Sequence, residues 1–209
     1  MSRIFDKYAE EYDGWFDKNK EVFRSELEAV KRLIPEGKDV IEVGVGSGRF
    51  ASELSVNIGI DPSLSMVKMA KRRGIDVLLG KAEDLPFNDN SFDFVLMMTT
   101  LCFLEEPLKA IRESERVLRD DGRIIIGMID KDSFLGRKYE SNKQESTFYK
   151  EANFYSIDKV IDLLQSSGFE RVNTVQTLFK DIDQIGSVED IKEGYGEGGF
   201  VVISAVKAN

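Results

Sequence analysis

The sequence predicts an α/β fold, with a doubly wound, mostly parallel sheet of seven strands and helices on both faces. Short apolar runs alternate with helix-spaced segments along most of the chain, which is the pattern of strand–helix–strand units. The last two apolar runs have no helical period between them, so the last strand is expected to be antiparallel. The length of 209 residues favours a single domain over 1–209.

The first half of the chain contains one clear helical pattern, the glycine turn and four strands. Apolar residues at helical spacing predict a helix over 17–34, closed by the Pro-Glu-Gly sequence at 35–37. A short helix follows the glycines. Ser63 is placed to N-cap a further helix over 64–73 that stops at Gly74. Strands are expected at 39–43, 56–60, 75–79 and 92–97.

The second half continues the alternation and then changes character. Pro107 suits a helix start. The apolar side of that helix comprises Leu108, Ile111, Val117 and Leu118. Residues 131–155 show no clean periodicity but are rich in aromatic residues, as in long functional loops. A helix is expected over 156–167, and the remaining strands at 124–128, 170–179 and 200–206.

Composition and charge exclude several function classes. A net charge of −9 without a long basic run disfavours nucleic acid and anionic membrane surfaces as partners. No apolar run reaches the ~20 residues of a membrane span, and the N-terminus lacks a signal-peptide pattern, so a cytoplasmic protein is expected. The absence of histidine excludes His-based catalysis and the common zinc sites, so we expect no metal.

A glycine turn preceded by a carboxylate is the main functional motif. Residues 40–48 read Val-Ile-Glu-Val-Gly-Val-Gly-Ser-Gly, which places Glu42 ahead of Gly44, Gly46 and Gly48. A buried strand that breaks into such a turn lets backbone pass close to a nucleotide ligand. A nearby carboxylate repels a pyrophosphate but suits ammonium and sulfonium charges. A dinucleotide site and a plain strand–helix turn remain alternatives.

Two later segments add to this motif. Asp61 ends the second strand, where a carboxylate can accept hydrogen bonds from both hydroxyls of a ribose. The third strand ends in a polar loop at 80–87, which is placed to meet an adenine edge. The alternatives are that Asp61 only caps the next helix and that Glu83 and Asp84 are solvated loop residues.

These motifs, in this order, resemble those of the class I S-adenosylmethionine-dependent methyltransferases, most closely the small-molecule group that includes quinone-biosynthesis enzymes. The matching segments are Glu42-x-Gly44-x-Gly46-x-Gly48, Asp61-Pro62-Ser63, Ala82-Glu83-Asp84-Leu85-Pro86-Phe87, Ser91-Phe92-Asp93 and Arg116-Val117-Leu118 before Gly122. The N-terminal segment around Tyr8 and Tyr12 also looks like that of the group. The resemblance covers about 5 to 175 and implies a Rossmann-like sheet with S-adenosylmethionine as the cofactor.

The resemblance also implies roles for individual residues. Gly44, Gly46 and Gly48 are expected around the methionine end of the cofactor, supported by Glu42, and Asp61 at the ribose. Pro62, Ser63, Met66, Ala82 and Glu83 are expected near the adenine. Met97 is expected to offer its backbone carbonyl to the amino group of the methionine moiety. Lys81 departs from the family, which often has an acidic residue there, and Cys102 and Phe103 stand where many relatives carry paired histidines.

The sequence says less about the part of the site that would bind the methyl acceptor. An N-terminal helical lid at 1–35 and an inserted segment at 131–155 are expected to cover the substrate, which suits a flat or apolar small molecule. Candidate acceptor-side residues are Tyr8, Tyr12, Trp15, Thr99, Thr100, Cys102 and Phe103. The aromatic residues among 8–16 are alternatively a helix face packed on the core, and Cys102 a small buried hydrophobe.

The predicted function is methyl transfer to an N, O or C nucleophile of a small molecule by a monomer or homodimer. Tyr8, Tyr12 and Asp13 are candidate bases if the acceptor is a hydroxyl, but the sequence does not assign a catalytic residue. A non-catalytic cofactor-binding or scaffold protein of the same fold is the alternative, because the Cys102-Phe103 pair alters the expected site. An NAD-dependent oxidoreductase is a further alternative.

Overall fold

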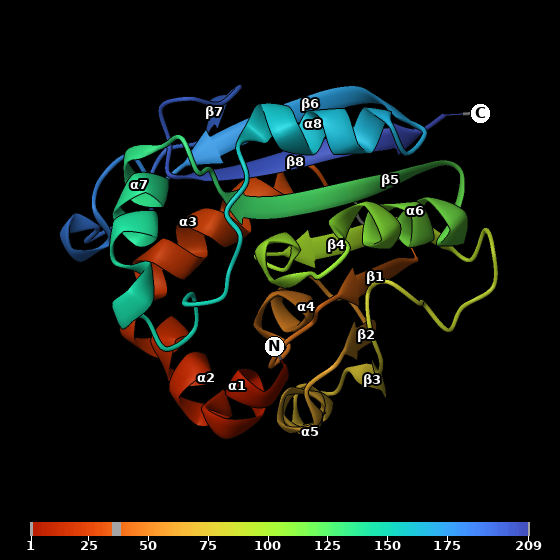
Figure 1. Ribbon diagram of the computed structural model, residues 1–209, viewed down its shortest axis with the longest axis horizontal. Helices are drawn as coiled ribbons and strands as arrows, with labels where there is room; N and C mark the ends of the chain where they lie inside the picture. Colours follow the sequence, from red (N-terminus) through yellow and green to blue (C-terminus); the bar gives the residue numbers. More distant parts are fainter. Residues whose placement is uncertain (1, 35–38, 209) are drawn as a thin grey trace.

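The computed structural model describes residues 2–34 and 39–208, which fold around an eight-stranded sheet of order β3-β2-β1-β4-β5-β8-β6-β7 (Figure 1). The strands are β1 (Val40–Val43), β2 (Ile58–Asp61), β3 (Asp76–Leu79), β4 (Phe92–Met98), β5 (Leu118–Ile129), β6 (Phe169–Thr177), β7 (Lys192–Glu193) and β8 (Phe200–Lys207). The first five in chain order pair in parallel, and β8 is antiparallel to both β5 and β6. The predicted doubly wound, mostly parallel sheet with an antiparallel last strand is confirmed.

The predicted count of seven strands is one short. The additional strand, β7, pairs antiparallel with β6 at the end of the sheet. Its two residues, Lys192 and Glu193, are charged and exposed. A strand this short has no apolar alternation, so the sequence carries no signal for it.

Helices cover both faces of the sheet. They are α1 (Ser2–Lys7), α2 (Ala9–Lys18), α3 (Lys20–Lys31), α4 (Arg49–Glu53), α5 (Leu64–Arg72), α6 (Pro107–Val117), α7 (Phe134–Ser141) and α8 (Ile157–Gln165), with short 3₁₀ turns η1 (Leu101–Phe103), η2 (Lys143–Glu145) and η3 (Ile182–Gln184). Among the described residues, no helix has the length and apolar character needed to cross a membrane.

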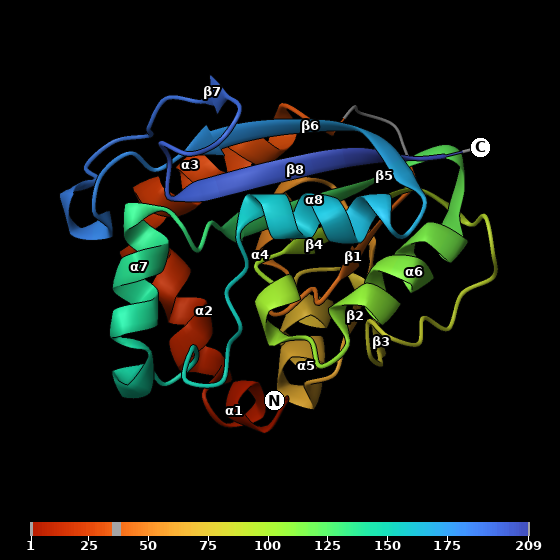
Figure 2. The same cartoon turned by 45° about the horizontal axis from the view of Figure 1, so that its top comes forward.

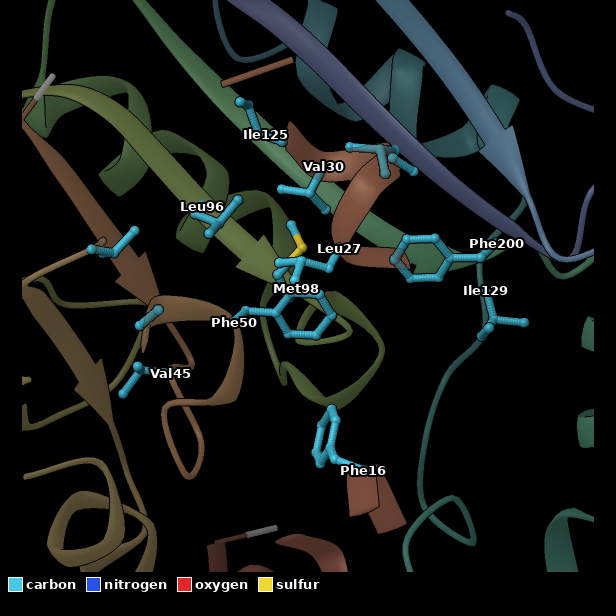
Figure 3. Close-up of a cluster of buried hydrophobic side chains, with 14 of the residues drawn as sticks. Phe16, Leu27, Val30, Val45, Phe50, Leu96, Met98, Ile125, Ile129 and Phe200 are labelled. Carbon is cyan, nitrogen blue, oxygen red and sulfur yellow. The ribbon is translucent and has the colours of Figure 1, made fainter. Parts of the chain in front are cut away.

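Two apolar clusters hold these layers together. One packs α2, α3, α4 and α5 against the sheet, and Figure 3 shows part of it around Leu96, Met98 and Phe200. The other packs α6 and α8 against the opposite face of the sheet (Figure 2). Val95 and Met97 belong to this second cluster. Alternate residues of β4 thus enter opposite clusters, as the two-residue period of a strand requires.

The N-terminal helices differ from the single helix predicted over 17–34. The chain forms α2 and α3, which meet at Asn19, where φ is −116° and ψ is 48°. The Trp15 carbonyl near the end of α2 accepts from both the backbone amide and the side-chain amide of Asn19, each at 2.9 Å. The helix α3 ends at Lys31, and the predicted stop at 35–37 lies outside the described residues.

Two further boundaries need correction. Leu118 was expected on the apolar side of the helix that begins at Pro107, but it begins β5 and is buried there. Residues 131–155 contain the helix α7, although their sequence shows no helical periodicity. Ser133 caps this helix by accepting from the Gly136 amide at 3.0 Å.

Candidate functional site

A cavity of about 300 Å³ opens where the carboxyl ends of β1 to β4 meet α1 and α2. Its wall comprises Phe5, Tyr12, Gly44, Gly46, Ile60, Asp61, Pro62, Ser63, Met66, residues 80–83, residues 98–100 and residues 103–105. In the sheet order, β1 and β4 are the neighbours at which the chain changes direction. Ligands of open α/β sheets bind outside the carboxyl ends of the strands at such a switch point.

Two positions of the glycine loop after β1, Gly44 and Gly48, leave no room for a side chain. Gly44, Gly46 and Gly48 have φ values of 75°, 53° and 85°. A Cβ atom on Gly44 would lie 2.4 Å from the Thr100 side chain, and one on Gly48 would lie 2.6 Å from Ile75. Gly44 and Gly46 line the cavity, whereas Gly48 packs behind the loop.

Asp61 joins the glycine loop to the start of α5. Its carboxylate accepts from the Gly46 amide at 2.9 Å and from the Ser63 amide at 2.8 Å. The residue is only 8% exposed, yet it lines the cavity. Burial raises its pKa to about 6 against the effect of these two hydrogen bonds, so the group titrates near neutral pH.

Glu42 lies beneath the loop rather than in the cavity wall. It is 2% exposed, and its Oε2 atom has no hydrogen-bond partner among the described residues. Burial raises its pKa well above 4.5, and a hydrogen bond from the Ala51 amide opposes this only in part. A buried carboxylate oxygen without a partner is unfavourable unless a ligand or water satisfies it.

The expected adenine-side residues come together along one wall. Pro62, Ser63, Met66, Ala82 and Glu83 all line the cavity, and Lys81 lies there as well. The Ser63 hydroxyl accepts from the Met66 amide at 3.3 Å, which confirms the predicted N-cap. The Glu83 carboxylate accepts from the amides of Glu105 and Glu106 at 3.3 and 3.5 Å, so it bridges two loops of the wall.

Arg116, part of a family-like motif, supports this wall from outside. Its guanidinium donates to the carbonyls of Leu85 and Phe87 at 3.0 and 2.8 Å. Its ion-pair partner Glu113 in turn accepts from the Leu85 amide at 2.8 Å. These contacts over about 30 residues fix the loop after β3, and the sequence alone did not predict them.

The end of β4 presents its last residues to the cavity. Met97 does not line it, because its side chain enters the apolar cluster on the opposite face, whereas Met98, Thr99 and Thr100 do. Thr99 has a φ of 49°, which is unusual for a β-branched residue. The Thr100 hydroxyl lies 3.1 Å from the Met98 carbonyl oxygen, to which it donates.

The structure separates the expected acceptor-side residues into two groups. Tyr12, Thr99, Thr100 and Phe103 line the cavity. Tyr8, Trp15 and Cys102 lie outside it. Tyr8 contacts the Phe148 ring and Trp15 the Phe16 ring, while Cys102 lines a separate slot beside Tyr149. Burial raises the Cys102 pKa to about 12, so its thiol is neutral.

An ion network that the sequence did not predict holds α2 on the glycine loop. Asp13 accepts from Arg49 Nε and Nη2 at 2.8 Å and from Arg73 Nη2 at 2.9 Å, and Arg73 also donates to the Ser47 carbonyl at 2.7 Å. Burial opposes ionisation of Asp13, but the arginine hydrogen bonds outweigh it and lower the pKa to about 2. Asp13 is therefore an ion-pair partner and not a base at neutral pH.

A second contact holds α1 at the other end of α5. The Asp6 carboxylate accepts from the Ser63 hydroxyl at 2.7 Å and from the Ser65 amide at 3.0 Å. Hydrogen bonds, first from the Ser65 amide and then from the Ser63 hydroxyl, lower the pKa of Asp6. We call the Asp6 and Asp13 contacts together the N-terminal clasp, because they fix α1 and α2 over the cavity.

Aromatic rings from three segments close the cavity on the side of Phe5 and Tyr12. Phe148 lies 5.7 Å from Phe5 and 5.4 Å from Tyr12 between ring centroids. Tyr149 stacks on Phe103 at 5.7 Å and on Tyr139 of α7 at 5.2 Å. The N-terminal helices and part of the segment 131–155 thus meet at this end of the cavity.

Comparisons with known proteins agree with this geometry. A family model described as "Methyltransferase domain" matches residues 41–126. An uncharacterized protein of Methanocaldococcus jannaschii is 56% identical over 204 residues, which cover 98% of this chain and 98% of that protein.

Two relatives carry a described activity. A crystal structure from Thermotoga maritima, described as a SAM-dependent methyltransferase and possible histamine N-methyltransferase, is 48% identical, covers 99% of this chain and 100% of its own, and has a TM-score of 0.97. A demethylmenaquinone methyltransferase of Renibacterium salmoninarum is 32% identical over 147 residues, which cover 64% of this chain and 60% of that protein.

Proposed function

Because the chain belongs to the class I S-adenosylmethionine-dependent methyltransferases, we propose that it transfers the methyl group of this cofactor to a small-molecule acceptor. The observation that carries the proposal is the cavity at the carboxyl ends of β1 to β4. It joins the glycine loop and Asp61 at one end to a wall of aromatic rings and threonines at the other.

The residues of the cavity suit the parts of the cofactor. Gly44 and Gly46 admit the methionine part of the cofactor close to the backbone. The unpartnered oxygen of Glu42 lies beneath that loop, where it can accept a hydrogen bond from the loop side of a bound ligand or from water. Asp61 is placed to accept from ribose hydroxyls. The expected adenine-side residues are Pro62, Ser63, Met66, Ala82 and Glu83.

The chain contributes mainly alignment of the reactants. S-adenosylmethionine supplies an electrophilic methyl carbon on a sulfonium centre. Positioning an acceptor against it can account for about 7–11 kcal/mol of the barrier. Burial, the largest influence, raises the pKa of Tyr12, so this hydroxyl stays neutral and serves as a hydrogen-bonding group beside Thr99. With Cys102 neutral as well, the acceptor end favours nucleophiles that need little deprotonation, such as neutral amines.

The test is a methyl-transfer assay with S-adenosylmethionine and a panel of nitrogen, oxygen and carbon acceptors, read by mass spectrometry. The panel includes histamine and a demethylated naphthoquinol, because relatives are described with these activities. We expect a product 14 mass units heavier for at least one acceptor class. Cofactor binding without transfer across the panel would indicate the non-catalytic alternative, and binding of NADH in place of S-adenosylhomocysteine would indicate the oxidoreductase.

A further inference from the structure

The outer edge of β3 is an open end of the sheet. Among the described residues, β3 is the last strand on its side and pairs only with β2 (Figure 1). The amides of Asp76 and Gly80 donate to carbonyls on the side of β2, at 2.8 and 3.1 Å. Because alternate residues of a strand direct their backbone groups to opposite sides, those of Val77 and Leu79 face outward. Such a row of outward N–H and C=O groups is a template for another strand.

Exposed leucines lie on and beside this edge. Leu78 and Leu79 are 41% and 58% exposed, and Leu64, at the start of the helix α5 that packs on β3, is 50% exposed. The other large apolar side chains exposed in residues 2–34 and 39–208 are Val188 and Tyr195, between η3 and β8. Natural sheet edges are ordinarily protected by charged residues or proline. The centre of β3 carries neither, which is typical of a surface that another chain covers.

The side chains of β3 match a second copy of the same strand running antiparallel. In a register centred on Leu78, each Val77 lies opposite Leu79 of the second copy, and the two Leu78 residues lie opposite each other. The outward groups of Val77 and Leu79 then form four backbone hydrogen bonds. A register centred on Val77 would instead set Leu78 opposite Asp76, and one centred on Leu79 would set it opposite Gly80. The register centred on Leu78 therefore pairs the apolar residues of β3 with one another.

The charges at the two ends of β3 also favour this antiparallel arrangement. Lys71 and Arg72, exposed in the last turn of α5, precede β3, whereas Glu83 and Asp84 follow it. Antiparallel pairing lays the basic end of one copy beside the acidic end of the other, and it does so twice because of the two-fold symmetry. It brings Arg72 towards Asp84 of the second copy, which is a favourable pair of opposite charges.

Each end of β3 also carries one residue of the other sign. Asp76 lies at the basic end and Lys81 at the acidic end, and both are exposed. In the register centred on Leu78, Asp76 lies opposite Gly80 of the second copy, next to its Lys81. These two residues are therefore neighbours across the axis. A parallel arrangement would set like ends side by side, which is unfavourable.

We propose that two copies of this chain associate through their β3 edges, antiparallel about a two-fold axis at Leu78, so that the sheet continues from one subunit into the other. Such a closed, self-complementary contact is the commonest form of homo-oligomer interface. The inference goes beyond the proposed methyl transfer and does not depend on it. The interface adjoins the cavity, because Gly80 and Lys81 follow β3 directly and line the cavity wall.

Sedimentation equilibrium of the 209-residue chain without ligand tests the interface. We expect a monomer–dimer equilibrium with a dissociation constant in about the micromolar range. Leu78→Lys sets like charges opposite each other at the axis and should weaken the dimer at least about tenfold. Val188→Lys makes the same change at a comparable exposure, 37%, and should stay within about twofold of wild type. A monomeric wild type at about 200 μM, or a Leu78→Lys dimer as tight as wild type, would overturn the inference.

A charge exchange tests the antiparallel arrangement separately. Arg72→Glu brings like charges together near Asp84 of the second copy, so at low salt it should weaken the dimer about threefold or more. Combining it with Asp84→Arg restores opposite charges and should return the dissociation constant to within about twofold of wild type. No weakening in the single variant, or no recovery in the double variant, would contradict this arrangement of the two strands.

Oxidative cross-linking at position 78 locates the axis. Leu78→Cys is introduced together with Cys102→Ser, which removes the one natural thiol of the chain. Opposite residues of a non-hydrogen-bonded antiparallel pair are about 4.5 Å apart between Cα atoms, which is within the range of a disulfide. Mild oxidation should therefore link most chains as covalent dimers, whereas Val188→Cys in the same background should remain mostly monomeric. Equal cross-linking of the two variants, or none in Leu78→Cys, would overturn the inference.

Discussion

At the residue scale, the glycine loop shows how side-chain size and backbone angle act together. Gly44 and Gly74 both have positive φ values, 75° and 84°. A Cβ atom on Gly44 would overlap the Thr100 side chain, whereas one on Gly74 would meet no atom within 4 Å. The two positions therefore separate backbone strain from steric overlap.

We expect Gly74→Ala to lower the free energy of unfolding by about 1–2 kcal/mol through backbone strain alone. Gly44→Ala should lose a further 1–3 kcal/mol or so, because overlap with Thr100 forces the loop to move. Urea unfolding of both variants measures the difference. Equal losses would mean that the loop accommodates the methyl group.

Glu26 gives a prediction for the pH dependence of stability. Its pKa is about 8 in the folded protein against an ordinary value of 4.5, so the folded state binds more protons between these values. The contribution of Glu26 to stability is therefore complete below pH 4.5 and falls as pH rises towards 8. The Gln side chain of Glu26→Gln does not titrate, so this variant should not lose stability in this way as pH rises.

Glu26→Gln should accordingly be a few kcal/mol more stable than wild type at pH 8, and the difference should shrink towards pH 5. Unfolding by urea at several pH values measures it, with Glu28→Gln as the control. A constant difference across this range would show that Glu26 does not titrate as described.

Local patterns predicted some of the site residues, and only the fold could supply others. Gly44, Gly46 and Asp61 stand at strand ends, where spacing alone places them at the ligand edge of a sheet. Asp13, in contrast, pairs with Arg49 and Arg73, which are 36 and 60 residues away. Nothing local in a sequence specifies which arginine a carboxylate will meet.

At the element scale, the N-terminal clasp determines how α1 and α2 cover the cavity. Asp6 fixes α1 at the start of α5. Asp13 fixes α2 by pairing with Arg73, which directly follows the end of α5. Phe5 and Tyr12, the chain neighbours of Asp6 and Asp13, form part of the cavity wall. A ligand that fills the cavity therefore comes into contact with the helices that the clasp holds.

Breaking the clasp should loosen these helices without unfolding the sheet. Asp13→Ala leaves Arg49 and Arg73 without their shared partner, so amide hydrogen exchange over residues 2–18 should become at least tenfold faster. Asp17→Ala is the matched control, because Asp17 also binds Arg49 but its side chain is 62% exposed against 13% for Asp13. Equal exchange in both variants would show that the clasp does not hold α2.

The same scale shows which elements a sequence can reveal. Apolar runs that end at glycine or aspartate predicted β1 and β2 closely. The break between α2 and α3 lies at the non-helical backbone angles of Asn19, and β7 depends on backbone pairing of two charged residues. Neither feature changes the hydrophobic periodicity, so periodicity could not predict them.

At the scale of the whole molecule, β8 joins the two halves of the sheet. Phe200 pairs with Ile129 of β5 and with Thr177 of β6, and its side chain is fully buried. A Cβ atom on Gly127 would lie 2.8 Å from the Phe200 ring, so that glycine makes room for it. Figure 3 shows the Phe200 ring in the same cluster as Leu27 and Val30 of α3 and Ile129 of β5.

Phe200→Ala should therefore lower the free energy of unfolding by about 3–5 kcal/mol, through lost burial and the cavity that remains. Chemical denaturation measures this, and Val188→Ala, at a partly exposed loop position, should change stability by less than about 0.5 kcal/mol. Similar losses of unfolding free energy in the two variants would show that Phe200 is not central to the core.

Calorimetric titration of S-adenosylhomocysteine at pH 8 and pH 5 tests whether the cavity beside Asp61 binds the cofactor. Ribose hydroxyls bind the ionised form of Asp61, whose pKa is about 6, so the wild type should bind roughly tenfold more weakly at pH 5. Asp61→Asn should bind weakly at both pH values, and the exposed control Asp76→Asn should follow the wild type. Absence of binding by the wild type, or wild-type affinity and pH dependence in Asp61→Asn, would contradict a cofactor site at Asp61.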